Sequence, residues 1–140
     1  MILELKDQVI SLESAKRLKE LGCPQESLFY WMINKGNPND SKYMFYKETQ
    51  SYKRYKKIKS QGCIEYISTY TASELGELLP TMIRINGIKH ILMIGKGFNP
   101  NCWKVSYRGG PNHKIIIDSV NEAEARAKML IHLKEEGVVK

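Results

Sequence analysis

The stretch "SVNEAEARAKMLIHLKEEG", residues 119–137, decides the fold. Glu122 and Glu124 suit the positive N-terminal end of a helix, and Gly137 suits the position after its last turn. The sequence therefore predicts a helix over residues 119–136, with Asp118 as a capping residue before it. Its apolar residues recur at the spacing of one helix face that would dock on the core: Val120, Ala123, Ala127, Leu130 and Ile131.

Two further helices are predicted upstream. In residues 11–22, Ser11 stands where its hydroxyl can accept from the free amides of a first turn, and an apolar stripe follows it. In residues 71–80, Thr71 and Glu74 have the spacing of a capping box, and Pro80 ends the segment.

Strands fill the intervals. Residues 28–33 are apolar on both alternating sets, which is typical of a central strand covered on both faces. Asn86 and Gly87 tolerate the positive φ of a type I′ turn and predict a tight hairpin. The order helix–strands–helix–strands–helix predicts one small α+β domain over residues 1–140, with a mainly antiparallel sheet. Further strands are expected at residues 42–48, 63–69, 102–108 and 113–119, the last two paired around the turn 109–112.

Positive charge gathers in one segment. Residues 42–59 hold seven of the 22 Lys and Arg residues and one of the 15 acids, in a chain of net charge +7. Within "SYKRYKKIK", residues 51–59, Tyr and Ile recur every third position with cations between them. Aromatic rings among cations are what single-stranded nucleic acid requires of a protein surface. The candidate contact residues are Lys53, Arg54, Tyr55, Lys56, Lys57 and Lys59.

A solvated surface is the competing interpretation of this segment. No aromatic RNA-binding strand motif, GXXG clamp or zinc finger accompanies it in the sequence. Lysine-rich excursions also protect sheet edges from aggregation. Both interpretations stay open on the sequence alone.

The sequence predicts no enzyme. No nucleophile, base and orienting acid can be assembled from it, and the three cysteines never form a CxxC pair. We therefore expect no catalytic residue, no metal site and no cofactor. The longest large-apolar run, residues 28–33, is too short to cross a bilayer, and the first eight residues lack a signal peptide's apolar run. A cytoplasmic protein without membrane contact is expected.

Three pieces of the chain resemble a known group: "SLESAKRLKELGCPQESLFYW", "TASELGELLP" and "EAEARAKMLIHLKEEG". They are similar to small uncharacterised proteins encoded by bacteriophages, prophages and other mobile elements. The resemblance implies a bacterial-cytoplasm setting but no activity, and it does not reach residues 35–62. The leading hypothesis is a non-catalytic binding or adaptor protein with an unknown macromolecular partner. The alternative is a nucleic-acid-binding accessory protein that uses segment 42–59.

Overall fold

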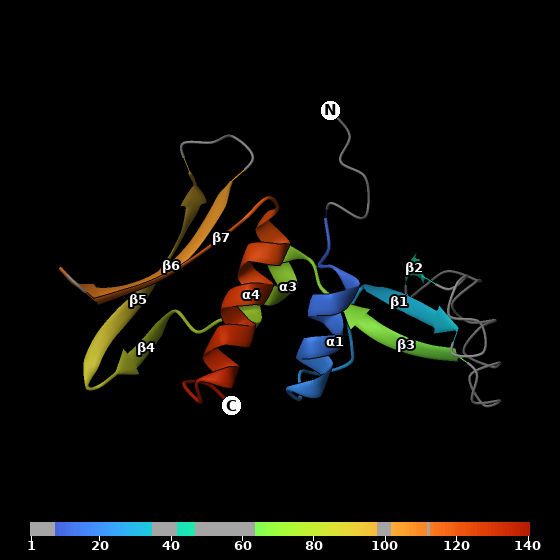
Figure 1. Ribbon diagram of the computed structural model, residues 1–140, viewed down its shortest axis with the longest axis horizontal. Helices are drawn as coiled ribbons and strands as arrows, with labels where there is room; N and C mark the ends of the chain where they lie inside the picture. The colour runs from blue at the N-terminus through green and yellow to red at the C-terminus, as the bar shows by residue number, and fades with distance from the viewer. Residues whose placement is uncertain (1–7, 35–41, 47–63, 98–101, 112) are drawn as a thin grey trace.

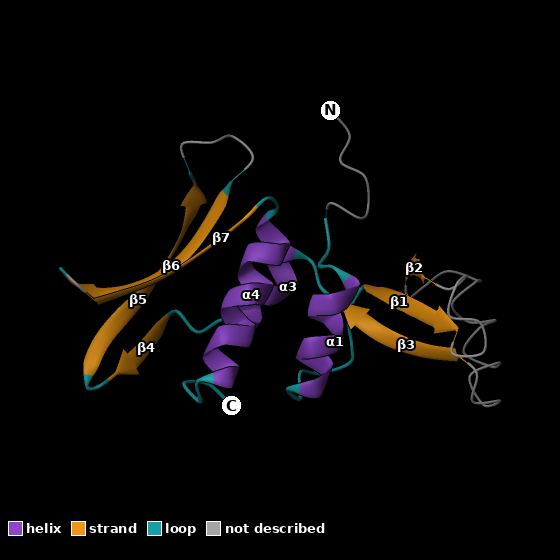
Figure 2. Ribbon diagram, viewed as in Figure 1, coloured by secondary structure: helices purple, strands orange, loops and turns teal. Residues whose placement is uncertain are grey.

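In the part of the chain that the structure describes, three helices stand between two antiparallel sheets (Figure 1). The computed structural model describes residues 8–34, 42–46, 64–97, 102–111 and 113–140. The α+β class and the predicted order of helices and strands are confirmed, but the strands form two sheets instead of one (Figure 2). The helices are α1 (Leu12–Glu20), α3 (Ala72–Leu78) and α4 (Glu122–Glu135).

The first sheet has the strand order β2-β1-β3. Its strands are β1 (Phe29–Asn34), β2 (Lys42–Tyr46) and β3 (Ile64–Thr69), and β1 pairs antiparallel with both neighbours. The predicted central position of β1 is thus confirmed. Tyr30 and Met32 are buried on one side of β1, while Trp31 and Ile33 pack partly buried against the core on the other.

The second sheet has the order β4-β5-β6-β7 and lies on the other side of the helices. The predicted turn joins β4 to β5, because Asn86 and Gly87 both have positive φ, at 53° and 81°. The predicted pairing around residues 109–112 is also present, with Gly110 opposite His113. The four strands are β4 (Met82–Ile85), β5 (Ile88–Lys96), β6 (Trp103–Gly110) and β7 (His113–Ser119).

Replacing Gly87 by Val should destabilise the protein by about 1–3 kcal/mol, the usual cost of holding a non-glycine residue in a left-handed conformation. No atom lies within 4 Å of a Cβ added there, so the loss would come from backbone strain alone. Gly87→Asn is the matched control, because Asn tolerates positive φ. Denaturant unfolding that ranks the two variants equally would contradict the turn described.

The helix α4 is shorter than predicted and buried on more than one side. It begins at Glu122, with Asn121 as the N-cap, so Asp118 lies in β7 and does not cap the helix. The prediction that Val120 lies on the docked stripe is wrong, because Val120 precedes the helix and is 77% exposed. The helix contacts α1, α3, β6 and β7, which explains why its buried residues surround most of the helix. They are Ala123, Glu124, Ala125, Ala127, Met129, Leu130 and Leu133.

A buried carboxylate joins the first turns of α1 and α4. One Glu124 oxygen accepts from the Ser11 backbone amide at 3.1 Å. The other accepts from the Ser11 hydroxyl at 3.0 Å and from the Ser14 hydroxyl. Glu124 therefore supplies acceptors where a helix start has free donors, and its charge suits that positive end. This contact ties the first helix of the chain to the last.

Candidate functional site

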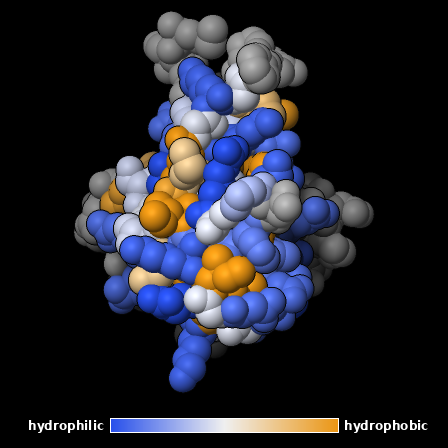
Figure 3. Space-filling view, turned by 90° about the vertical axis from the view of Figure 1, so that its left-hand side faces the viewer, coloured by the Kyte–Doolittle hydropathy of each residue, from blue (hydrophilic) through white to orange (hydrophobic). Residues whose placement is uncertain are grey.

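Among the described residues, only one face of the second sheet packs against the core. Ile83, Val105 and Tyr107 are buried in the core on the side of α4. The alternating residues lie on the opposite side, because neighbouring side chains of a strand point to opposite faces. We call that side the open face, and Figure 3 views the molecule from the end at which this sheet lies. Its residues are Met82, Arg84, Lys89, Ile91, Met93, Gly95, Lys104, Ser106, Arg108, Lys114, Ile116 and Asp118.

Large apolar side chains are exposed at the centre of the open face. The exposed fractions are 40% for Met82, 52% for Ile91, 53% for Met93 and 37% for Ile116. These four account for most of the exposed large hydrophobic residues in the described part of the chain. Monomeric proteins rarely gather such residues without a binding role. Figure 3 shows apolar patches bordered by hydrophilic surface at the end of the molecule where this sheet lies.

The cations of the open face form like-charge pairs. Arg84 lies opposite Lys89 across β4 and β5, and Arg108 lies opposite Lys114 across β6 and β7. Like charges directly opposite one another destabilise a sheet, and opposite charges would stabilise it. A sheet selected for stability alone would not need either pair. The arrangement is instead what a surface requires when it attracts an anionic partner.

These cations are available for a partner. In the described residues, Lys89, Lys104, Arg108 and Lys114 form no ion pair within 4 Å, although Lys104 has Asp118 opposite it. Among the described residues, Arg84 donates only to the Gly87 carbonyl oxygen, at 3.5 Å. Over residues 80–118 the sequence contains six Lys or Arg residues and one acid. The sheet is therefore a second basic region of the chain.

The candidate contact residues predicted from the sequence lie outside the described residues. All six fall within residues 47–63: Lys53, Arg54, Tyr55, Lys56, Lys57 and Lys59. Their role in nucleic-acid binding stays a prediction. The open face was missed because its residues come from four strands and become neighbours only through strand pairing. The signal that could have revealed it was the excess of cations at alternating strand positions.

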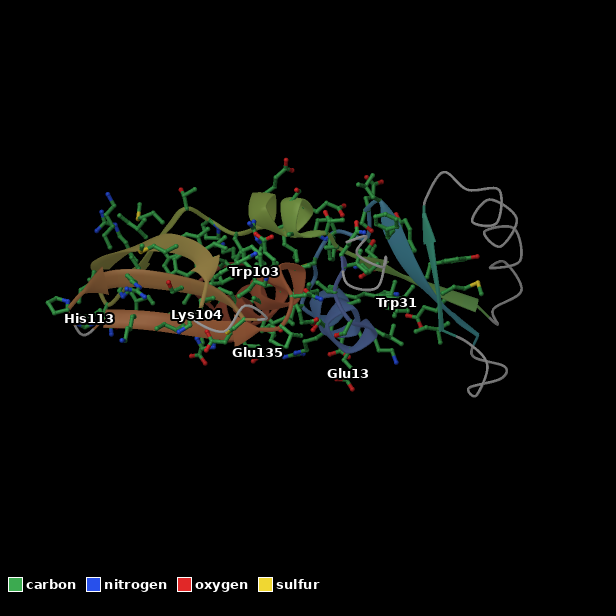
Figure 4. The ribbon with its side chains drawn as sticks, turned by 90° about the horizontal axis from the view of Figure 1, so that it is seen from above. Glu13, Trp31, Trp103, Lys104, His113 and Glu135 are labelled. Atoms are coloured by element: carbon green, nitrogen blue, oxygen red, sulfur yellow. The ribbon has the colours of Figure 1, made fainter. Side chains whose placement is uncertain are left out.

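Two side chains with reactive groups, Cys23 and His90, are buried in the described part of the molecule. Burial raises the pKa of the Cys23 thiol, which lies in a cavity of about 360 Å³ beside Leu130 and Lys134. His90 is buried, with its Nδ1 2.8 Å from the Ile88 carbonyl oxygen and its ring edge-on to His113. Figure 4 places His113 at the end of the sheet farthest from the helices.

Two phenols are held by hydrogen bonds to carbonyl groups. The Tyr107 hydroxyl donates to the Pro80 oxygen at 2.6 Å, and burial raises the pKa of Tyr107 to about 12. The Tyr70 hydroxyl donates to the Pro24 oxygen, and its pKa is raised mainly by burial. The described residues contain no group of three or more His, Cys, Asp or Glu that could hold a metal ion. Nor does any described helix have the length and apolarity to span a membrane.

No family model, curated protein or solved structure matches the chain. The resemblance to phage-type proteins therefore stays a prediction.

Proposed function

We propose that this protein is a non-catalytic binding module that holds an anionic macromolecule on the open face of the β4–β7 sheet. The observation that carries the proposal is the pairing of cation with cation beside exposed apolar residues. The pairs Arg84–Lys89 and Arg108–Lys114 lower the stability of the sheet, and Met82, Ile91 and Met93 leave apolar area in water. An anionic partner with apolar groups would relieve both costs. The resemblance to phage-type proteins suggests the bacterial cytoplasm as the setting.

The shape of the surface supports binding over catalysis. Enzyme sites are concave and bury most of a small substrate. The open face is instead a broad surface formed by four strands, and its charged residues are exposed. Such a surface suits a macromolecule that contacts many residues at once.

A pair of double variants tests the proposal. Arg108→Glu/Lys114→Glu reverses two charges of the open face, and Lys16→Glu/Lys128→Glu reverses two exposed lysines on α1 and α4. Both variants change the net charge by the same amount, so a difference between them reports position. Each protein, and the wild type, is immobilised, and captured proteins and nucleic acids from its native cells are identified. We expect a partner that the wild type and the helix variant retain and that the open-face variant loses. Equal capture by all three would contradict the proposal.

The single substitution Lys114→Glu should stabilise the fold while it weakens binding. It converts the like-charge pair with Arg108 into an opposite-charge pair, worth about 0.2–1 kcal/mol in a sheet. The melting temperature should therefore rise, and the captured amount of the partner should fall. A variant that melts below the wild type would contradict the view that these cations are kept for binding.

A further inference from the structure

We infer that the partner segment held by the open face is an acidic amphipathic helix of another protein. This inference rests on the proposed function and specifies its partner. It depends on the arrangement of the apolar and basic residues in two parallel stripes, which the strand registers establish.

The apolar stripe runs obliquely across all four strands. Met82 and Ile91 lie opposite one another on β4 and β5. Two residues further along β5, Met93 lies opposite Ser106, which lies opposite Ile116. Between β4 and β7 the stripe therefore shifts by two residues along the strand direction. Ser106 is buried at its centre, although it lies on the open face.

The basic stripe takes the same oblique path. Arg84 and Lys89 lie opposite one another on β4 and β5, two residues away from Met82 and Ile91. Arg108 and Lys114 continue it on β6 and β7, two residues away from Ser106 and Ile116. Four cations therefore line the same flank of the apolar stripe. Lys104 and Asp118 lie on its other flank and cancel in charge.

The dimensions of these stripes suit a helix. Three strand spacings of about 4.8 Å and one two-residue step of about 6.7 Å give a stripe about 16 Å long. A helix rising 1.5 Å per residue covers that length in about 11 residues, or three turns. Apolar residues at i, i+3, i+4 and i+7 would lie on the apolar stripe. Acids at i+1, i+5 and i+8 would then lie on one flank of the helix, beside the four cations.

Other occupants fit the surface less well. Nucleic acid bound by a sheet stacks its bases on aromatic rings. The described open face has none, since Tyr107 is buried on the side of the core. A second copy of the chain would bring like-charged stripes together if the two open faces met. An acidic helix satisfies both the apolar and the basic stripe.

A displayed library of 14-residue helical peptides with randomised positions tests the inference on the full-length protein. Wild-type protein is the target, and Arg108→Glu/Lys114→Glu is used for counter-selection. We expect enriched peptides with apolar residues at i, i+3, i+4 and i+7 and with Asp or Glu along one flank. Moving the acids of an enriched peptide to i+2, i+6 and i+9, away from the sheet, should weaken binding roughly 10- to 100-fold. The same loss is expected with the open-face variant.

The contrary outcomes are distinct. Enriched peptides without the acidic flank, or no enrichment at all, would overturn the inference. Binding of single-stranded or duplex oligonucleotides that Arg108→Glu/Lys114→Glu abolishes would overturn it too, while the proposed function would stand. A wild-type dimer that this variant dissociates in sedimentation experiments would contradict the proposed function as well, because a second copy of this chain carries a net charge of +7 and is not an anionic partner. Oligonucleotide and peptide binding that are both insensitive to the variant would contradict the proposed function as well.

Discussion

Leu130→Ala should lower the free energy of unfolding by about 2–5 kcal/mol, which is the range for a buried Leu that leaves a cavity. Leu130 is 2% exposed in the core cluster, on the helix that contacts α1, α3 and the second sheet. The substitution removes contacts from the core that α4 shares with its neighbouring elements.

Val120→Ala is the matched control. The sequence pattern placed Val120 on the same apolar stripe as Leu130, but the structure exposes 77% of it. Its substitution should change the free energy of unfolding by no more than about 0.5 kcal/mol. Chemical denaturation of both variants separates the two accounts of α4. Equal losses of unfolding free energy in the two variants would support the longer helix that the sequence pattern predicted.

Glu124→Ala should cost about 2–4 kcal/mol, since it leaves the donors of Ser11 and Ser14 without their acceptor. Ser11 is exposed, so water can replace part of the lost acceptor. The loss of stability should therefore be smaller than the summed cost of leaving three fully buried donors unpaired. Glu13→Ala removes an exposed acid from the first turn of α1 and serves as the control, with a change within about 0.5 kcal/mol.

A double-mutant cycle shows whether Glu124 acts through this contact. Ser14→Ala removes one of the donors, so the two substitutions should be less than additive in thermal or denaturant unfolding. Strict additivity would mean that Glu124 stabilises the protein by some other interaction.

Local sequence signals were sufficient to predict most of the helices and turns. Thr71 and Glu74 form the predicted capping box, and the side chain of Ser11 accepts from the Ser14 amide at the start of α1. Asn86 and Gly87 form the predicted turn. Each of these features depends on residues within four positions of one another. Their physical chemistry is therefore decided before any tertiary contact forms.

Features that depend on distant contacts were not predictable in the same way. Val120 fits a helical period, but Asn121 caps α4 and leaves Val120 in the connection from β7. The division of the strands into two sheets was not predictable, because no local sequence pattern indicates which strands pair. Ser14 and Glu124 are 110 positions apart, so their contact has no signature in sequence.

The candidate site depended on such distant contacts most of all. Counted along the chain, the basic residues of β4–β7 are separated by apolar positions, and the acids elsewhere offset them. The continuous cluster in residues 42–59 was the more visible feature. Only the registers of the four strands bring Arg84, Lys89, Arg108 and Lys114 to one flank of an apolar stripe.

Site-specific photo-crosslinking tests the claim that the open face is the binding surface most directly. A benzophenone amino acid is placed at Ile91, in the apolar stripe, or at Glu13, on α1 in the part of the molecule away from that sheet (Figure 4). Both proteins are irradiated in their native cells. We predict a discrete crosslinked adduct from position 91, lost when Arg108→Glu/Lys114→Glu is added, and none from position 13. An adduct at position 13 with none at position 91 would contradict the account.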